Sequence, residues 1–402
     1  MVIKEINSVC FVGAGTIGCA NAMVAGLAGY RVSVYDNSPE NLALVPQRLA
    51  AIGTYVVMQG FCPQAAVDHV IAQLVLTDNL ARATKAVELV SESVFENLEI
   101  KRQVHSQLDA LCPPETIITT NTSSLLVSQI EDVVSATRAK LFAALHSHLG
   151  STLIDIVPGP RTDPATLEIL ERYVISLDAV PLVLKKENPG YVVNAMLGPI
   201  MTAAMLMLQR RLGSIEDIDR AWMKHQGLPI GPFGLLDLFG INLIYGSWQQ
   251  PRPAADYAAN KAEIMALLMP YIKRQELGRL TGKGFYTYPD AAFEDSDFLK
   301  QATDAGPYPH YGVLRTVLVH NAILLAIKEI AAPTVIDRAW ITATGAQRGP
   351  FEILDELGAE QYAKHLATHR RDGWVNDDPN AVDAYLQRCD RPHAISEKIE
   401  TP

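Results

Sequence analysis

The sequence lacks several features that would place it in a specialised class of protein. It has no uninterrupted apolar run of about 18 residues, so it predicts no membrane-spanning helix, and residues 1–5 lack the apolar core of a signal peptide. Basic residues are outnumbered: 34 Lys and Arg face 44 Asp and Glu, which gives a net charge of −10 without a basic run. We therefore expect neither nucleic acid nor an anionic membrane as a partner.

Cysteine is also scarce. The five cysteines are odd in number, scattered and without a Cys-x-x-Cys spacing (Cys10, Cys19, Cys62, Cys112 and Cys389). This pattern excludes a disulfide framework and a cysteine-based zinc site, and it is typical of reduced thiols in the cytoplasm. The 402 residues are 49% hydrophobic and 19% charged, which indicates a compact globular chain of two or three domains.

The first half of the chain alternates short apolar runs with stretches of helical periodicity. The expected strands lie at 9–12, 31–35, 87–90, 116–119 and 141–145, and two further strands are expected at 153–157 and 180–184. This alternation is typical of a parallel sheet covered on both faces, so we expect an α/β domain of the Rossmann type over residues 1–187. Residues 39–80 are too long for an ordinary connection and predict a helical hairpin that projects from the sheet.

The second half changes character after Pro189-Gly190. Residues 191–212 are rich in Met, Ala and Leu, which favour helices, and strand signals nearly vanish beyond them. We therefore expect the remainder of the chain to be all-α.

An internal repeat divides this helical half. Ile218-Asp219-Arg220-Ala221-Trp222 recurs as Ile336-Asp337-Arg338-Ala339-Trp340, and Gly231-Pro232-Phe233 recurs as Gly349-Pro350-Phe351, in each case 118 residues later. The constant register indicates a duplicated module, so we expect two helical domains in tandem, at 188–290 and 291–402. The second copy is expected to be structural, in a chain that is a monomer or a homodimer.

A glycine-rich turn follows the first expected strand. In Gly13-Ala14-Gly15-Thr16-Ile17-Gly18, Gly13 permits a tight turn, Gly15 lets a pyrophosphate approach the backbone, and Gly18 lets the next helix pack closely. The first amides of that helix, at Thr16 and Ile17, are then free to bind phosphate. The second expected strand ends at Asp36, whose carboxylate can bind the adenosine ribose and would repel a 2′-phosphate. The segment predicts NAD as the cofactor.

Three polar segments occur where a Rossmann sheet presents its carboxyl-end crevice. They are Asn121-Thr122-Ser123-Ser124, His146-Ser147-His148, and Asn194 with the residues before it. A dehydrogenase needs a base for the alcohol proton, and histidine titrates near neutrality. Asp155 follows His146 by nine residues at the centre of an expected strand and could fix the imidazole tautomer, while Ser123 and Asn194 could bind the substrate oxygen.

A metal site is the competing interpretation of the two histidines. His146 and His148 could share one face of an extended segment and ligate a metal ion. The sequence shows no third ligand beside them, so we expect no metal.

Together, these motifs resemble the L-3-hydroxyacyl-CoA dehydrogenase family from about residue 6 to residue 290. The matching segments are 13–18, 96–101, 121–124, 189–194, 231–237 and 281–286. The resemblance implies NAD-dependent oxidation of an L-3-hydroxyacyl-CoA to the 3-oxoacyl-CoA, in fatty acid metabolism.

The resemblance also implies roles for individual residues. It places three residues at the cofactor cleft: Glu96, Lys101 and Asn121. Ser123 would contact both substrate and nicotinamide, His146 would be the base, and Asn194 would bind the reacting oxygen. Asp155 would replace the glutamate with which the family's histidine is paired.

Departures from the family leave alternatives open. The family usually follows its histidine with Asn-Pro, where this chain has Ser147-His148 and a loop about three residues shorter, so His148 remains an alternative base. The hairpin at 39–80 offers only Arg48 to the phosphates of CoA. A small CoA-free hydroxy acid, of the gulonate or carnitine type, is therefore an alternative substrate. A third possibility is an inactive NAD-binding structural homologue.

Overall fold

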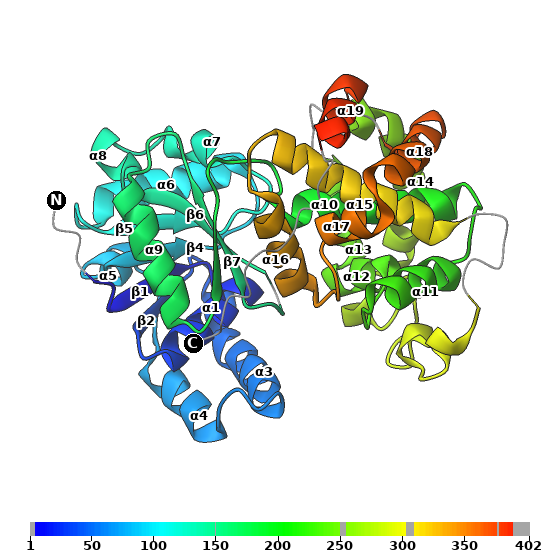
Figure 1. The fold of residues 1–402 in the computed structure, drawn as a ribbon. Helices are drawn as coiled ribbons and strands as arrows, with labels where there is room; N and C mark the ends of the chain where they lie inside the picture. Colours follow the sequence, from blue (N-terminus) through cyan, green and yellow to red (C-terminus); the bar gives the residue numbers. More distant parts are fainter. Residues whose placement is uncertain (1–4, 149, 250–254, 303–308, 376–377, 389–402) are drawn as a thin grey trace. The chain divides into compact units, whose positions relative to one another are not determined.

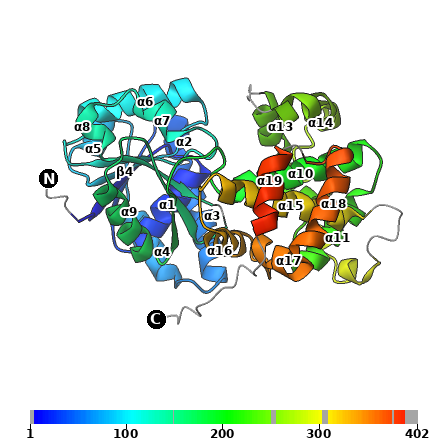
Figure 2. The same cartoon turned by 45° about the horizontal axis from the view of Figure 1, so that its top comes forward.

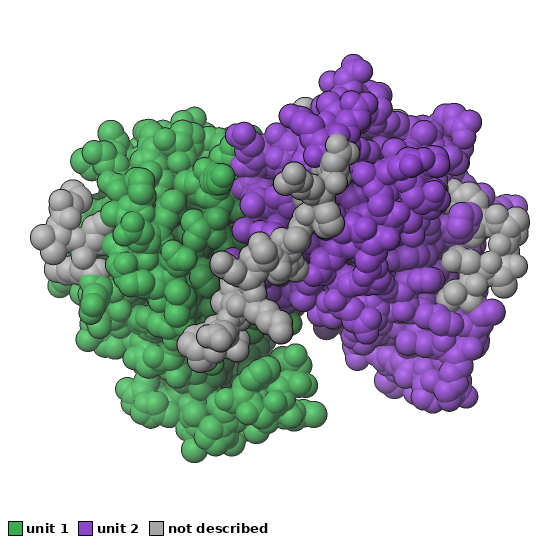
Figure 3. Space-filling view, viewed as in Figure 1, with its two compact units in different colours: residues 1–191 green, residues 192–402 purple. Residues whose placement is uncertain are grey.

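The computed structural model describes residues 5–148, 150–249, 255–302, 309–375 and 378–388, so Cys389 lies outside the described residues. The chain forms two compact units, Met1–Tyr191 and Val192–Pro402 (Figure 3). The boundary between them lies close to the expected one after residue 187. Both copies of the repeat belong to unit 2, and its division into two domains at residue 290 stays a prediction.

Unit 1 is built on one eight-stranded sheet with the strand order β3-β2-β1-β4-β5-β6-β7-β8 (Figure 1). The strands are β1 (Ser8–Val12), β2 (Arg31–Tyr35), β3 (Val75–Thr77), β4 (Leu89–Glu92), β5 (Ile117–Thr120), β6 (Phe142–Ser147), β7 (Leu153–Pro158) and β8 (Val180–Val183). The seven expected strands are all present. Strand β3 was missed because its short run lies inside the predicted hairpin.

The parallel arrangement expected from the first five strands is confirmed for those strands, and the two further strands run in the opposite direction. Strands β1 to β6 are parallel to their neighbours, but β7 is antiparallel to β6 and β8 is parallel to β7. A parallel crossover needs a dozen or more residues, and only residues 148–152 connect β6 to β7. The two strands therefore form a hairpin, whose register pairs His146 with Asp155.

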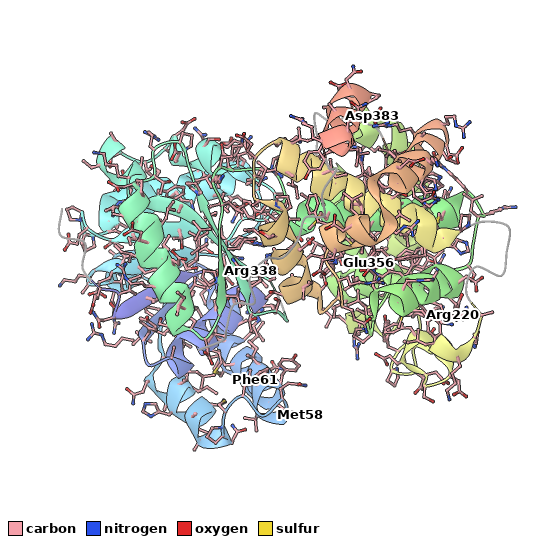
Figure 4. The ribbon with its side chains drawn as sticks, in the orientation of Figure 1. Met58, Phe61, Arg220, Arg338, Glu356 and Asp383 are labelled. Atoms are coloured by element: carbon pink, nitrogen blue, oxygen red, sulfur yellow. The ribbon has the colours of Figure 1, made fainter. Side chains whose placement is uncertain are left out.

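The sheet is covered by helices, and the predicted hairpin is present. It consists of α3 (Val45–Met58) and α4 (Gln64–Gln73). Its connection exposes the apolar side chains of Met58 and Phe61, which are 79% and 71% exposed (Figure 4). The other helices of unit 1 are α1 (Thr16–Leu27), α2 (Pro39–Ala43), α5 (Leu80–Thr84), α6 (Leu98–Leu111), α7 (Val127–Glu131), α8 (Ala136–Ala139) and α9 (Pro164–Ser176).

Unit 2 contains two sets of helices that repeat with the spacing found in the sequence. The first set is α10 (Val193–Gln209), α11 (Ile215–Gln226), α12 (Pro232–Phe239) and α13 (Ile241–Gln249); the second is α15 (His310–Ile327), α16 (Pro333–Thr344), α17 (Pro350–Leu357) and α18 (Ala359–Arg371). Helices α14 (Ala255–Arg274) and α19 (Pro379–Arg388) follow their respective sets, and short 3-10 turns lie at Arg279–Thr281, Ala292–Glu294 and Phe298–Lys300. Helices α11 and α16 both end at a left-handed glycine, Gly227 and Gly345.

In each copy a buried aspartate accepts backbone hydrogen bonds from the N-terminus of the third helix, α12 in the first copy and α17 in the second. Asp219 accepts hydrogen bonds from the backbone N–H groups of Phe233 (2.8 Å) and Gly234 (3.0 Å). Its counterpart, Asp337, accepts them from Phe351 (2.8 Å) and from the residue after it (3.1 Å). The two aspartates are 118 residues apart, so the structure shows that the helical module is duplicated.

The two copies pack on each other through reciprocal helix contacts. The equivalent helices α10 and α15 lie side by side (Figures 1 and 2), and α11 packs on α15 as α16 packs on α10. The equivalent tryptophans Trp222 and Trp340 meet edge to face with their ring centroids 6.4 Å apart. Such reciprocal contacts are those of an isologous interface, here formed within a single chain.

Helix α15 has the length and mean hydropathy of a membrane-spanning segment, although the sequence predicted none. Its 18-residue window is 67% buried inside the structure, where Val313, Leu314 and Val317 are among its buried residues. We therefore interpret α15 as the core helix of the second copy.

The matched caps lead to a stability prediction. We expect Asp219→Ala and Asp337→Ala each to lower the free energy of unfolding by about 1–3 kcal/mol, because each leaves two backbone N–H groups, at least one of them buried, without an acceptor. Asp219→Ala also removes the acceptor of the buried Tyr286 hydroxyl. Urea denaturation of the full chain measures both. Asp297→Ala is the control, since its carboxylate is 70% exposed and its loss should change the free energy by less than about 0.5 kcal/mol. If Asp337→Ala left the free energy of unfolding unchanged, the cap of the second copy would not be stabilising.

Candidate active site

The glycine-rich turn lies between β1 and α1, as the sequence predicts. Gly13 has a φ of +108°, and a Cβ on Gly18 would lie 1.9 Å from the carbonyl oxygen of Gly13. Around Gly15, in contrast, nothing lies within 4 Å of an added Cβ. No side chain caps the N-terminus of α1 and its first turn holds no acidic residue. Space and free N–H groups for a pyrophosphate are therefore both present at Gly15, Thr16 and Ile17.

Asp36 follows the end of β2 and holds the glycine-rich turn in place. Its Oδ2 accepts a hydrogen bond from Ala14 N (2.8 Å) and its Oδ1 accepts one from Ser38 N (2.9 Å). Arg48 of α3 donates from Nη1 to the carbonyl oxygens of Ala14 (2.7 Å) and Asn41 (3.3 Å). Asp36 thus shapes the dinucleotide turn, and its bond to a ribose stays a prediction.

The open space at Gly15 leads to a second prediction. We expect Gly15→Ala to fold with unchanged stability, because no protein atom meets the new methyl group, but to weaken NAD binding by at least about tenfold, since the methyl occupies the position where the pyrophosphate approaches. Calorimetric titration with NAD measures the affinity. Gly246→Ala, where a Cβ also meets nothing within 4 Å, is the control. Unchanged NAD affinity in Gly15→Ala would place the pyrophosphate elsewhere.

Glu96 organises the loop that carries Ser123. Its Oε1 accepts hydrogen bonds from the hydroxyls of Thr122 (2.6 Å) and Ser124 (2.8 Å) and from the backbone N–H groups of Ser123 and Ser124, both at 3.1 Å. Burial alone would raise the pKa of Glu96, but Lys101 and the two hydroxyls lower it below its ordinary value. Glu96 is therefore an anion that fixes this loop, and the hydroxyl of Ser123 makes no hydrogen bond to a described residue.

A buried polar network beside this loop was not foreseen from the sequence. Glu92, at the carboxyl end of β4, accepts hydrogen bonds from Lys101 Nζ (2.7 Å), Val94 N (2.6 Å) and Thr120 Oγ1 (2.7 Å), and its Oε2 lies 2.9 Å from His105 Nε2. Burial alone would raise the pKa of Glu92, but Lys101 and His105 lower it to about 2.

This network changes the interpretation of Lys101. The side chain is only 1% exposed and pairs with Glu92, with Glu96 3.4 Å away. Its predicted contact with the cofactor stays a prediction, because the structure shows it as the counter-ion of two carboxylates. The signal that could have identified the network was a carboxylate ending an otherwise apolar buried strand.

The β6–β7 hairpin brings the predicted base and its partner together. His146 and Asp155 are directly opposite each other in the antiparallel register, so their side chains lie on the same face of the sheet. His146 Nδ1 is 2.9 Å from Asp155 Oδ2. Because the carboxylate can only accept, Nδ1 carries the proton, and Nε2 is left as the basic nitrogen.

His148 reaches the same carboxylate. It lies two residues beyond His146, so the alternation of side chains along the extended segment places both rings on one face. His148 Nε2 is 2.9 Å from Asp155 Oδ2, and the ring centroids of the two histidines are 4.5 Å apart. The other oxygen of Asp155, Oδ1, is buried without a hydrogen-bond partner among the described residues.

Burial and the two histidines set the protonation of this cluster. Burial lowers the pKa of His146 below its ordinary 6.5, Asp155 opposes this effect, and His148 adds to it. Burial alone would raise the pKa of Asp155, but the hydrogen bonds from both histidines lower it below its ordinary 3.8. At neutral pH the site therefore contains an ionised Asp155 and a neutral His146, ready to accept a proton.

The hairpin supplies the third potential metal ligand that the sequence did not show. One ligand atom from each of His146, His148 and Asp155 lies within 4.8 Å of the others. Both nitrogen–oxygen separations are ordinary hydrogen-bond distances, so the three residues form a hydrogen-bonded array, and the expectation of no metal stays a prediction.

Of the remaining predicted residues, Asn121 lies beside this array and Asn194 lies in unit 2, and Tyr191, which was not predicted as a site residue, lies next to His146. Asn121 Oδ1 accepts hydrogen bonds from Ser147 N (2.9 Å) and Oγ (3.2 Å), which holds the end of β6. Tyr191, whose ring centroid lies 5.4 Å from that of His146, donates its hydroxyl to Thr122 O. Asn194 lies in the first turn of α10, in unit 2, and its contact with the substrate stays a prediction.

Comparison with known proteins gives consistent results. Residues 8–187 match "3-hydroxyacyl-CoA dehydrogenase, NAD binding domain", and residues 190–288 match "3-hydroxyacyl-CoA dehydrogenase, C-terminal domain". The mitochondrial hydroxyacyl-coenzyme A dehydrogenase of Rattus norvegicus is 30% identical over 294 residues, covering 70% of this chain and 91% of the rat protein.

Solved structures of similar fold cover the same regions. A diketoreductase that acts on dicarbonyl compounds is 30% identical, with a TM-score of 0.64, and covers 71% of this chain and 100% of its own. A 3-hydroxybutyryl-CoA dehydrogenase from Escherichia coli is 20% identical and covers 96% of this chain and 99% of its own, with a TM-score of 0.74. The second similarity shows that the fold extends over both helical copies.

Proposed function

The chain belongs to the 3-hydroxyacyl-CoA dehydrogenase family of NAD-dependent oxidoreductases that act on CH–OH groups, and from this premise we propose that it oxidises an L-3-hydroxyacyl-CoA to the 3-oxoacyl-CoA with His146 as the base. The observation that carries the proposal is the buried pair of His146 Nδ1 and Asp155 Oδ2, 2.9 Å apart, in the hairpin register. This pair leaves one defined nitrogen, Nε2, to take the proton of the substrate hydroxyl.

The site residues of unit 1 have separate roles in the reaction. NAD, bound at the glycine-rich turn, supplies the acceptor for the hydride that leaves the substrate carbon. Nε2 of His146 takes the hydroxyl proton, and the carboxylate of Asp155 stabilises the resulting imidazolium. Ser123, on the loop held by Glu96, presents a free hydroxyl to the oxygen on which carbonyl character develops. In the reverse direction the imidazolium returns the proton.

The pH dependence of the reaction follows from the burial of His146. Because burial lowers the pKa of His146 below 6.5, the base stays neutral at pH 7. We expect kcat/KM for oxidation to be constant above pH 7 and to fall tenfold per pH unit only well below pH 6.5. Initial rates measured across pH, at saturating NAD, test this. If the midpoint of the acid decline in kcat/KM lay above pH 7, a group other than His146 would be the base.

The substrate class is tested by direct assay. We expect NADH to form when the chain is mixed with NAD and L-3-hydroxybutyryl-CoA or a longer homologue, and none to form with the free acid. The D enantiomer of the same thioester is the matched control, since the hydride and the base must lie on defined sides of the reacting carbon. If no NADH formed with thioesters of any chain length, the thioester proposal would be wrong.

A CoA-free substrate is the second candidate function, and one contact favours it. Arg48 is the only basic side chain within residues 39–80, and it donates to two carbonyl oxygens at the dinucleotide turn. The hairpin therefore offers the phosphates of CoA no uncommitted guanidinium. The similarity to a diketoreductase supports the same candidate. Formation of NADH with a small CoA-free hydroxy acid, or consumption of NADH with a CoA-free dicarbonyl compound, without turnover of the thioesters, would establish it.

A further inference from the structure

We propose that His148 is a positioning residue for the reaction: its Nε2–H holds the Asp155 carboxylate that orients His146, and thereby limits how strongly that carboxylate acts on the base. This inference rests on the proposed role of His146. It concerns a residue at which the chain departs from the Asn-Pro of the family's pattern, and to which no relative's name assigns a function.

The geometry restricts what His148 can do. Asp155 Oδ2 lies 2.9 Å from both His146 Nδ1 and His148 Nε2, so one oxygen accepts from two imidazoles. Both imidazoles must then donate, which places the proton of His148 on Nε2 and leaves that nitrogen unable to act as a base. The nitrogen left basic is then Nε2 in His146 and Nδ1 in His148, so the two histidines present different nitrogens.

The shared oxygen also weakens the pair between His146 and Asp155. A carboxylate oxygen that accepts two N–H donors places less of its charge on either one, while its second oxygen, Oδ1, has no partner among the described residues. Asp155 is completely buried, and His148 is 11% exposed, so water provides little compensation. Removal of the His148 donor would leave the whole charge of Oδ2 to His146.

The other groups around His146 do not oppose this conclusion. Asp155 on β7 and Glu96 after β4 both raise the pKa of His146, whereas His148 at the end of β6 lowers it. Tyr191 contacts the ring of His146, and burial raises the pKa of Tyr191 well above its ordinary value, which keeps that hydroxyl neutral. His148 is thus the residue of this set whose removal makes His146 more basic.

The experiment compares two substitutions of His148 in the full chain. His148→Phe keeps a ring and removes the donor, while His148→Gln keeps a donor of similar reach. Proton NMR of the histidine Cε1–H resonances, without substrate, gives the titration midpoint of His146, which is assigned by its loss in His146→Gln. We expect the midpoint to rise by about one pH unit in His148→Phe and to return close to the wild-type value in His148→Gln. His69→Gln, at an exposed position on α4, is the control and should leave it unchanged.

Kinetics provide the second readout. The acid limb of kcat/KM should shift by the same amount and in the same direction as the NMR midpoint, with KM for NAD unchanged. All variants are measured with a chelator, and wild type is measured both with and without it. An unchanged midpoint in His148→Phe, or a wild-type midpoint that moves on chelation because a metal joins the three residues, overturns the proposal. Because the NMR midpoint needs no turnover, an inactive chain would defeat the proposed function and leave this test intact.

Discussion

His146→Gln is expected to lower kcat by about 10²–10⁴-fold, the contribution of a positioned general base. Glutamine has a similar length and can still accept a hydrogen bond from a substrate hydroxyl, but it cannot take the proton. Since the side chain lies on β6 and the dinucleotide turn follows β1, the affinity for NAD should change by less than about threefold. Single-turnover formation of NADH measures the chemical step, and calorimetry measures the affinity for NAD.

Two further variants distinguish a base from a structural histidine. Asp155→Asn should also lower kcat, because the amide can present its N–H to Nδ1 and stabilise the wrong tautomer of His146. His69→Gln should retain wild-type kcat, since its ring is exposed on α4. If His146→Gln kept wild-type turnover while His148→Gln lost it, the roles of the two imidazoles would have to be exchanged.

Lys101→Met is expected to lower the free energy of unfolding by about 3–5 kcal/mol, because it leaves the buried carboxylate of Glu92 without its cation. The effect should appear in the absence of NAD, which distinguishes a structural ion pair from a cofactor contact. Urea denaturation of the full chain measures it. Lys185→Met, at an exposed lysine of the same unit, should change the free energy by less than about 0.5 kcal/mol.

The same network determines how unit 1 responds to acid. The pKa of Glu92 is about 2 in the folded chain, against an ordinary 4.5, so its contribution to stability is complete above pH 4.5 and is lost as the pH falls towards 2. The Lys101→Met variant should show a smaller loss over this range than wild type. If Lys101→Met kept the wild-type free energy of unfolding and only bound NAD less tightly, Lys101 would have the cofactor contact that the family resemblance implies.

The sequence contained enough information to predict most of the fold. The dinucleotide turn, the strands and the hairpin at 39–80 follow from local patterns of glycine and apolar residues. The 118-residue repeat predicted the second helical copy, and the caps at Asp219 and Asp337 show why those segments recur together. A short strand such as Val75–Thr77 could not be predicted, because three residues have too little periodicity to outweigh the helical stretch around them.

The candidate site was predicted residue by residue, but its contacts were not. His146 and Asp155 were identified as partners, but the direction of the strand that carries Asp155 was not predicted, and the direct pairing of the two residues depends on it. The short connection at 148–152 was the available signal for a hairpin. Reversal of β7 then places Asp155 against both imidazoles, which makes His148 a second donor to this carboxylate, while its role as an alternative base stays a prediction. The pairing of Lys101 with Glu92 could not be predicted, because it follows from the burial of Lys101, and burial depends on contacts with residues distant in the sequence.

The most direct test of the account is the position of the substrate oxygen in a crystal of the full chain with NADH and L-3-hydroxybutyryl-CoA, a pair that cannot react. We predict that the 3-hydroxyl oxygen lies within hydrogen-bond distance of His146 Nε2, about 2.6–3.2 Å, while both imidazoles remain on Asp155. An oxygen bound to His148 instead, or an imidazole of His146 turned away from the reacting carbon, would contradict the assignment of His146 as the base.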